Sequence, residues 1–407
     1  MHFLPILSTL RRHRTAAALI VLEIALTCAI VSNAVFLIRE RLASMDTYSG
    51  LAEDEIVRVQ LTGISDPEAG AAEAITAQDL AGLRAIPGVK SATVSNMVPF
   101  GNSSWNTGIS TIPDDPDSHS AAQYMGGPGQ LEAFGVKIIA GRDFTADEYI
   151  RFDDARAKKA IAASVIITRK VAERMFPGES AVGKSVYIND KQPQRVVGVI
   201  DTLERPNNVN GLDSAGYAMV LPISLPYNRA SNYVLRVDPA RRAEVIKAAD
   251  GVLEKVDPNR IILKRQTFDQ IRADHFKQDR SMAYLLTGVS IALLIITALG
   301  IVGLASFWVQ QRTRQIGVRR ALGATRSDIL HYFQTENFIL ATIGIVLGMA
   351  IAYAINLLLM SKYSIARLPA TYLPIGALVL WGLGQIAVLG PAMRAATIPP
   401  ATATRSV

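Results

Sequence analysis

Four long apolar stretches interrupt an otherwise polar chain, at residues 16–38, 282–309, 338–360 and 373–389. A helix needs about 20 apolar residues to cross the hydrocarbon layer of a bilayer. The first three stretches exceed that length, whereas the fourth is borderline and has an interfacial helix as its alternative. The first is longer than a signal-peptide core and lacks a clear small-x-small cleavage site, so we expect a retained anchor. The pattern predicts a membrane protein with four transmembrane helices.

Charge is distributed unevenly along the chain. Half of the 407 residues are apolar, 19% are charged, and the formal net charge is +7. Residues 39–280 hold 30 of the 42 basic side chains but 32 of the 35 acidic ones, so the positive excess lies beside the apolar stretches. This distribution is typical of cytoplasmic loops in membrane proteins and argues against a nucleic-acid surface.

The basic residues beside the apolar stretches predict the topology, because they favour the cytoplasmic side. Ten of them would share that side: Arg11, Arg12, Arg14, Arg312, Arg314, Arg319, Arg320, Arg326, Arg394 and Arg405. The loop between the third and fourth stretches has only Lys362 and Arg367. The expected order is a cytoplasmic N-terminus (1–15), helix 1 (16–38), an extracytoplasmic domain (39–280), helix 2 (281–309), a cytoplasmic segment (310–334), helix 3 (335–360), a short outer loop (361–372), helix 4 (373–390) and a cytoplasmic tail (391–407).

The extracytoplasmic region is predicted to be an α/β domain with two strand–helix–strand units. The strands are expected at 55–61, 89–95, 232–237 and 260–267. The first helix is expected to open at a capping box formed by Thr76 and Asp79. The second helix is expected to cover 239–256.

These units divide the extracytoplasmic domain into two expected lobes. Residues 50–100 and 231–270 would form one lobe, and the stretch 101–230, rich in Gly, Pro, Asn and Asp, would be inserted as the second. Neither Gly nor Pro occurs between Phe268 and Thr287, so a continuous helix is expected to lead into the second span. Such a helix would couple the domain mechanically to the membrane.

One motif resembles a nucleotide-binding phosphate loop. Residues Gly178–Ser185 fit the phosphate-loop pattern G-x-x-x-x-G-K-[ST]. A phosphate loop follows a strand and opens a helix, whereas here a helical pattern (168–176) precedes the motif and a strand pattern (185–188) follows it. We therefore interpret the match as false and expect a turn that binds no cofactor.

Other candidate sites are sparse. The only cysteine, Cys28, excludes a disulfide within the chain, and we expect no metal site. His119 ends an acidic loop that has a cation site as the alternative to a solvated loop. Glu23 is costly in lipid, so it either has a functional role or faces a neighbouring helix or the interface. Gly344 and Gly348 form a small-xxx-small pattern that permits close helix packing.

The segment after the second apolar stretch predicts a short basic helix, a break at Gly323 and a new helix near Thr325 or Ser327. Ile316, Arg320 and Gly323 fall near one face, which is a candidate surface for a soluble partner. The alternative is a basic loop that faces anionic lipid.

The same segment resembles the FtsX/MacB-type permeases of ABC transporters. Their signature is close to E-I-G-x-x-R-A-x-G-A, and residues 315–324 match it except that Gln315 replaces the usual Glu. Further matches are the GRDF-type segment at 134–144, the segment 175–184, which contains the false phosphate loop, the VVGV segment at 196–200 and a PARRAA-like ending at 391–396. The resemblance covers most of the chain.

The resemblance implies a fold and a mechanism. The periplasmic domain (39–280) would have a porter-like lobe (50–100 and 231–270) and a sabre-like lobe (101–230). A separate ATPase dimer, expected because only about 15 residues precede the first span, would bind ATP and Mg. It would dock on the segment 310–334 through these residues: Gln315, Ile316, Gly317, Arg319, Arg320, Ala321, Leu322, Gly323 and Ala324.

The implied protein is a non-catalytic permease subunit of the bacterial inner membrane, paired with a second identical or related permease. By mechanotransmission it would drive efflux of a periplasmic substrate through an adaptor and an outer channel. A Gly317→Arg variant is expected to lose transport while folding normally. Three alternatives remain at this point: a regulator of a cell-wall hydrolase or sensor kinase, a lipoprotein-releasing permease, and a membrane-anchored enzyme, which is disfavoured because no catalytic set of residues is visible.

Overall fold

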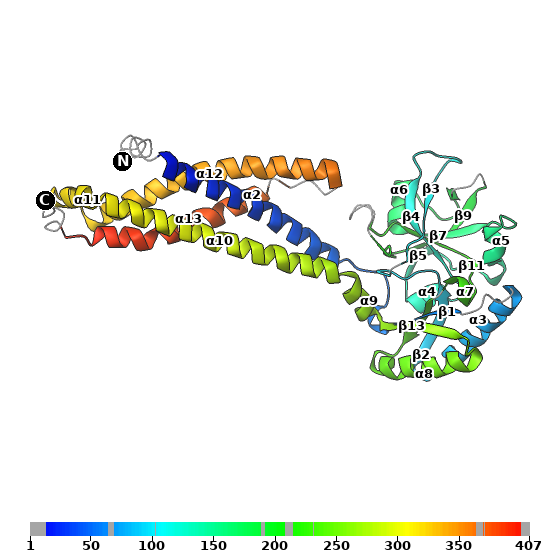
Figure 1. Ribbon diagram of the computed structural model, residues 1–407. Coiled ribbons are helices and arrows are strands. Elements are labelled where there is room, and N and C mark those ends of the chain that lie inside the picture. The colour runs from blue at the N-terminus through cyan, green and yellow to red at the C-terminus, as the bar shows by residue number, and fades with distance from the viewer. Residues whose placement is uncertain are drawn as a thin grey trace. The chain divides into compact units, whose positions relative to one another are not determined.

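The computed structural model describes residues 14–63, 69–101, 103–188, 192–207, 215–230, 232–363, 369 and 371–399. The chain forms two compact units (Figure 1). The helical unit comprises Met1–Met45 and Gln278–Val407, and the α/β unit comprises Asp46–Lys277. Of the predicted topology residues, Arg11, Arg12, Arg367 and Arg405 lie outside the described part of the chain.

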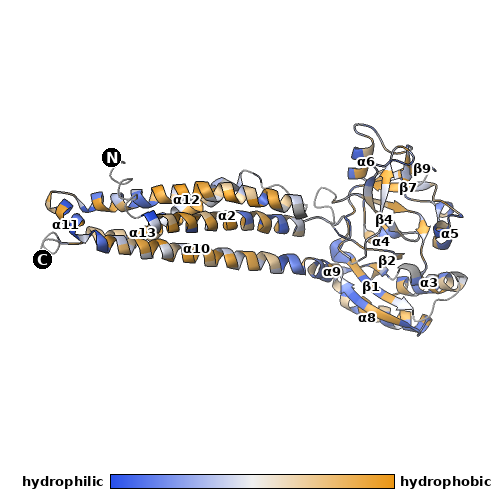
Figure 2. Ribbon diagram, turned by 45° about the horizontal axis from the view of Figure 1, so that its top comes forward, coloured by the Kyte–Doolittle hydropathy of each residue, from blue (hydrophilic) through white to orange (hydrophobic). Residues whose placement is uncertain are grey.

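Long helices make up the helical unit: α2 (Arg14–Met45), α10 (Lys277–Gln311), α12 (Arg326–Tyr363) and α13 (Tyr372–Ala396), with the short α11 (Thr313–Ala321) between α10 and α12. Within the described residues, the four long helices are long and apolar enough to cross a membrane, including the one that the sequence left borderline. Figure 2 shows hydrophobic residues along most of their length. The predicted number of apolar helices is confirmed.

Helices α2 and α12 pack closely at the small-residue pattern. A Cβ atom added at Gly344 would lie 2.8 Å from Cβ of Ile24, and one added at Gly348 would lie 2.5 Å from Cβ of Cys28. Both distances are shorter than van der Waals contact, so only glycine fits at either position. A hydrogen bond from Nδ2 of Asn33 to the carbonyl oxygen of Ala352 (3.2 Å) joins the same two helices.

In the α/β unit, the two strand–helix–strand units interleave in one antiparallel sheet of order β13-β1-β12-β2. Its elements are β1 (Ile56–Gly63), α3 (Ala69–Arg84), β2 (Val89–Ser95), β12 (Asn232–Val237), α8 (Arg242–Val256) and β13 (Arg260–Thr267). This order is the ferredoxin-like arrangement of two split βαβ halves. The four strands lie where the alternating pattern predicted them, and α8 follows a short 3-10 turn, η4 (Pro239–Arg241).

The predicted capping box is wrong. Helix α3 begins at Ala69, so Thr76 lies inside it and donates from Oγ1 to the carbonyl oxygen of Ala72 at 2.7 Å. Asp79 is fully buried and pairs with Arg260, which is distant in sequence. The spacing of the two residues fits a cap, but their side chains have tertiary partners instead.

The second sheet contains strands from the middle of the chain in the order β5-β9-β7-β10-β4-β3-β8, and β8 also pairs with β9, which closes a ring. The strands are β3 (Asn106–Ser110), β4 (His119–Met125), β5 (Ile138–Gly141), β7 (Ser164–Thr168), β8 (Ser185–Ile188), β9 (Gln194–Ile200) and β10 (Ala218–Leu221). Shorter elements are η1 (Glu53–Glu55), η2 (Ala146–Glu148), β6 (Ile150–Arg151), β11 (Ile223–Ser224), α4 (Gln130–Phe134), α5 (Phe152–Arg156), α6 (Arg169–Met175) and α7 (Tyr227–Ala230). The assignment of porter-like and sabre-like lobes stays a prediction.

The expected continuous helix is interrupted once. Helix α9 (Phe268–His275) ends before Phe276, and α10 begins at Lys277. Phe276 is buried, and its ring centroid lies 5.2 Å from that of Phe100 within the α/β unit. Burial of this aromatic side chain accounts for a helix break at which the sequence has neither Gly nor Pro.

Candidate functional site: the segment between α10 and α12

The segment between α10 and α12 has the local structure that the sequence predicted. Helix α11 ends in a left-handed Gly323 (φ 99°), whose N–H donates to the carbonyl oxygen of Arg320. Only glycine adopts this conformation without strain, so Gly323 terminates the helix. Thr325 then caps α12: its Oγ1 accepts from the backbone N–H of Asp328 (3.2 Å), and the Asp328 carboxylate accepts from Thr325 N–H (2.8 Å). The predicted break and the new helix start are confirmed.

One face of α11 packs on the chain's own helices. Ile316 is 5% exposed and lies in a cluster with Ile329 and Phe333 of α12 and Ala392 and Ala395 of α13. Its neighbour Gly317 is also buried. This face therefore fixes the orientation of α11 within the helical unit.

Arg320 strengthens that attachment. Its Nη1 donates to the carbonyl oxygens of Ala396 and Ile398, both at 2.9 Å, where α13 ends. The last carbonyl groups of a helix lack partners within the helix and carry partial negative charge, so a guanidinium there is favourable. Arg320 thus has an internal structural use in this chain.

Two residues of the predicted docking face have contacts within the chain. Ile316 and Arg320 were expected to contact a partner, but both contact α12 or α13 of the same chain. The structure also does not support the prediction that Gly317→Arg folds normally. Gly317 is buried, so the variant would place a long charged side chain in a buried position. The sequence shows which residues share a helix face but not which face is covered.

The opposite face of α11 is open. Gln315, Val318 and Leu322 follow one another at spacings of three and four and are all exposed, Val318 by 44% and Leu322 by 84%. Arg319 is also exposed, and its guanidinium lies 4.9 Å from the ring centroid of Tyr332. The exposed face thus combines two apolar side chains with a basic one held in position by an aromatic ring. Ala321 and Gly323 are exposed too, whereas Ala324 is half-buried.

A buried ion pair joins the start of this segment to α12. Nη1 of Arg312, the residue before α11, lies 3.0 Å and 2.8 Å from the two carboxylate oxygens of Glu336. The side chains are 7% and 2% exposed, and the Arg312 guanidinium lies 5.4 Å from the centroid of Trp308. Sequence reasoning missed this pair, although an acidic residue inside the predicted third span was a signal for it.

Glu23 faces a neighbouring helix. A Cβ atom added at Gly300 of α10 would lie 2.5 Å from Oε2 of Glu23, so the carboxylate covers this glycine. One turn along, Oγ1 of Thr27 and Oγ1 of Thr297 form a hydrogen bond of 2.8 Å between the same two helices. The half-buried carboxylate thus belongs to the contact between α2 and α10. Its functional role stays a prediction.

The false phosphate loop has the predicted order of elements. Helix α6 precedes it and strand β8 follows it, the reverse of a phosphate-binding loop. Lys184 pairs with Glu179, and its amino group lies 4.8 Å from the ring centroid of Phe176. The lysine thus has contacts within the turn.

Comparison with known families places these features in context. Residues 17–252 match the MacB-like periplasmic core domain, which is more than half of the chain, and residues 287–400 match the FtsX-like permease C-terminal family. The chain belongs to the MacB/FtsX family of ABC transporter permeases. With its four long apolar helices, this permease is a multi-pass membrane protein. The open face of α11 lies within the FtsX-like match.

Two of the curated relatives of this permease illustrate the similarity. It is 26% identical over 316 residues to "Macrolide export ATP-binding/permease protein MacB" of Shewanella sp. (strain W3-18-1), covering 72% of this chain and 43% of that protein. It is 27% identical over 299 residues to "Uncharacterized ABC transporter permease YknZ" of Bacillus subtilis (strain 168), covering 71% and 68%. This permease thus matches less than half of the length of the MacB relative.

A solved structure is also similar to this permease. The crystal structure of the periplasmic region of MacB from Actinobacillus actinomycetemcomitans is 15% identical, with a TM-score of 0.35, covering 56% of this chain and 95% of that one. A score this low carries no argument about function.

Proposed function

We propose that this permease is the membrane subunit of an ABC transporter and that a separate ATPase docks on the open face of α11. The exposed row of Gln315, Val318 and Leu322 carries the proposal, because Val318 and Leu322 are neighbours on one helix face and their apolar surface would be buried by a docked partner. Arg319 adds a cation that an acidic groove would recognise. The membership of the family in ABC transporters supports an ATPase as the occupant.

The internal face of α11 supports a coupling role. Ile316 and Arg320 attach α11 to α12 and α13, and Arg312 with Glu336 attaches its start to α12. Because these contacts are buried, a displacement of α11 by an ATPase would move the helices with it rather than bend a loose loop. ATP-driven motion would in this way reach the spans.

The proposed output is export by mechanotransmission in the inner membrane, with both termini cytoplasmic and Asp46–Lys277 in the periplasm. A pair of such permeases, identical or related, would change shape with each ATPase cycle and drive a periplasmic substrate into an adaptor and an outer channel. The name of the MacB relative, a macrolide exporter, supports efflux as the output. In this proposal the permease itself catalyses no reaction.

The test uses the tagged full-length chain, purified from its host in mild detergent, and identifies the ATPase that accompanies it. Val318→Asp and Leu322→Asp are expected to weaken retention of that ATPase about tenfold or more, because burial of one aliphatic side chain contributes about 1.5–3 kcal/mol. Leu322→Met on the same face and Ser327→Asp on α12 serve as controls that should retain it. Full retention by both aspartate variants would refute the docking face, and the absence of any ATPase with the wild-type chain would refute the proposed function.

A further inference from the structure

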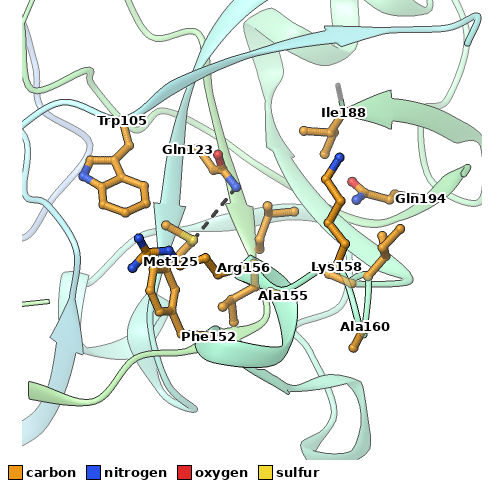
Figure 3. A pocket seen from close by; sticks show the side chains of 14 residues that line it. Trp105, Gln123, Met125, Phe152, Ala155, Arg156, Lys158, Ala160, Ile188 and Gln194 are labelled. Carbon is orange, nitrogen blue, oxygen red and sulfur yellow. Dashed lines mark hydrogen bonds between the residues drawn. The ribbon is translucent and has the colours of Figure 1, made fainter. Parts of the chain in front are cut away.

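A cavity of about 600 Å³ lies at one rim of the ring of strands in the α/β unit (Figure 3). Strands β4, β8 and β10 end there and β9 begins there, while α5 forms part of the wall. This volume falls within the range of about 300–1,000 Å³ that is common for small-molecule sites. All of its lining residues belong to the α/β unit.

Aromatic and aliphatic side chains form one wall of the cavity. The ring centroids of Trp105 and Phe152 are 6.1 Å apart in an edge-to-face arrangement. Trp105 is 39% exposed, whereas Phe152, Leu221 and Ile223 are each less than 9% exposed. A large aromatic residue that stays accessible at the mouth of a cavity is a typical contact for an apolar ligand.

Few polar side chains line the cavity, and the charged ones among them are basic. Arg156 and Lys158 are exposed at it, and no acidic residue belongs to its lining within the described chain. Neither basic side chain forms an ion pair or hydrogen bond with a described residue. Figure 3 shows Lys158 and Gln194 on one side of the cavity and Trp105 on the other.

The side-chain oxygen of Gln194 lacks a hydrogen-bond donor among the described residues. The residue is only 4% exposed, and its Oε1 is buried without a hydrogen-bond partner in the described structure. A buried acceptor without a partner is unfavourable by about 1–3 kcal/mol, so a donor group supplied from the cavity would be favoured. This acceptor is independent of the basic residues and also points to a ligand.

We propose that this cavity binds a small amphiphilic anion. An apolar body would contact Trp105 and Phe152, and a donor group would reach Oε1 of Gln194. An acidic group would face one of the two basic side chains, Arg156 on the side of Trp105 or Lys158 on the side of Gln194 (Figure 3). The proposal concerns binding by the permease alone and does not rest on docking of an ATPase or on transport.

The experiment uses the full-length chain in lipid nanodiscs, in a Trp308→Phe/Trp381→Phe background where Trp105 is the only tryptophan. The probe is 1-anilinonaphthalene-8-sulfonate, and the signal is quenching of Trp105 emission with energy transfer to the probe. Saturable quenching is expected. N-phenyl-1-naphthylamine, which lacks the sulfonate, is expected to bind about tenfold more weakly, since the charge-assisted hydrogen bond to the sulfonate is absent.

Matched variants make the result specific. Arg156→Ala/Lys158→Ala should weaken binding of the sulfonate probe about tenfold and leave binding of the uncharged probe unchanged. Lys247→Ala/Lys255→Ala removes the same charge from exposed positions on α8 and should change neither affinity. Ala155→Phe fills the cavity and should abolish the saturable signal of both probes, while energy transfer from probe dissolved in lipid would persist.

Two results would overturn the proposal. One is quenching that never saturates or that survives Ala155→Phe in a variant whose circular dichroism spectrum is unchanged. The other is equal affinity for the two probes together with no effect of Arg156→Ala/Lys158→Ala. Because no ATPase is present, neither result bears on the proposed docking face.

Discussion

Asp79 and Arg260 form a buried ion pair that joins α3 of one strand–helix–strand unit to β13 of the other. Arg260 Nη1 lies 2.5 Å from Oδ2 of Asp79, and Nη2 lies 2.7 Å from Oδ1. The arginine side chain is 1% exposed and the aspartate side chain 0%. The Tyr233 hydroxyl also donates to Asp79, and burial raises the pKa of Tyr233 well above its usual value. The pair therefore links elements that are far apart in sequence.

Asp79→Ala is expected to lower the free energy of unfolding by about 3–5 kcal/mol, because it leaves the Arg260 charge buried without a partner. Chemical denaturation of the chain in the Trp308→Phe/Trp381→Phe background, followed by Trp105 fluorescence, would measure the loss. The matched control is Asp269→Ala, which removes an exposed pair with Arg242 and should change stability by less than about 1 kcal/mol. Similar losses in the two variants would contradict the assigned role of the buried pair.

The pair of Arg142 and Glu148 predicts that the stability of the protein depends on pH. Arg142 lies in the GRDF-type segment (134–144), and Glu148 follows it. Hydrogen bonds from Arg142 (2.7 Å and 3.0 Å) lower the pKa of Glu148 from 4.5 to about 2, against an opposing effect of burial. Because the folded-state pKa is depressed, the stabilisation from this pair is present above about pH 4.5 and is lost as the pH falls towards 2. Arg142→Ala should return the pKa of Glu148 towards 4.5 and flatten the dependence of stability on pH in this window.

The titration of Glu148 can be followed by NMR of the labelled glutamate side chains, with denaturation midpoints measured at each pH. The control is Arg151→Ala, which breaks the exposed pair with Glu73 and should leave the pKa of Glu148 unchanged. A Glu148 pKa that stays near 2 without Arg142 would show that the Thr145 contacts alone depress it.

The close contact of α2 and α12 predicts that replacement of one glycine by a larger residue destabilises the protein. Gly348→Ala would place a methyl group 2.5 Å from Cβ of Cys28 and 2.6 Å from the carbonyl oxygen of Ala25. Overpacking of this kind costs about 1–3 kcal/mol, so the melting temperature in detergent should fall. Gly382→Ala on α13 is the control, because an added Cβ there has no described atom within 4 Å. Equal melting temperatures of the two alanine variants would contradict this, because they would show that α2 and α12 can move apart at little cost in free energy.

The sequence predicted local structure well where the signal is local. The strands β1, β2, β12 and β13 lie at the predicted positions, and the turn before β2 contains Gly88, whose φ of 100° favours glycine. The start of α3 was misplaced because Thr76 and Asp79 have the spacing of a cap, whereas Thr76 Oγ1 accepts from the backbone N–H of Tyr227 and Asp79 pairs with Arg260. Closure of the ring also needs the pairing of β3 with β8, which are far apart in sequence, and no local pattern encodes that pairing.

The candidate site shows the same limit. The break at Gly323 and the cap at Thr325 were predictable from residue type, because left-handed glycine and side-chain caps are local devices. Which face of α11 is open depends on α12 and α13, so Ile316 and Arg320 were assigned to a partner although they contact the chain itself. The cavity beside Trp105 gathers residues from 105 to 223 and likewise had no signal in the sequence.

The pair of Arg312 and Glu336 gives the last prediction, which separates coupling from stability. Glu336→Gln leaves the buried guanidinium without its counter-ion and is expected to destabilise the helical unit by about 3–5 kcal/mol, seen as a lower melting temperature. The double variant Arg312→Met/Glu336→Met removes both charges and should recover most of that stability, because an apolar pair of similar volume can replace a buried ion pair.

The double variant should still fail to transmit motion if the ion pair holds the start of α11 against α12, as the contact of Arg312 Nη1 with both carboxylate oxygens of Glu336 indicates. In nanodiscs with the copurified ATPase, we expect normal ATP hydrolysis and ATPase retention but a loss of nucleotide-dependent distance changes between spin labels on α11 and α12. Wild-type distance changes in a stable double variant would show that the apolar contacts of Ile316 suffice for coupling, and the ion pair would then serve stability alone.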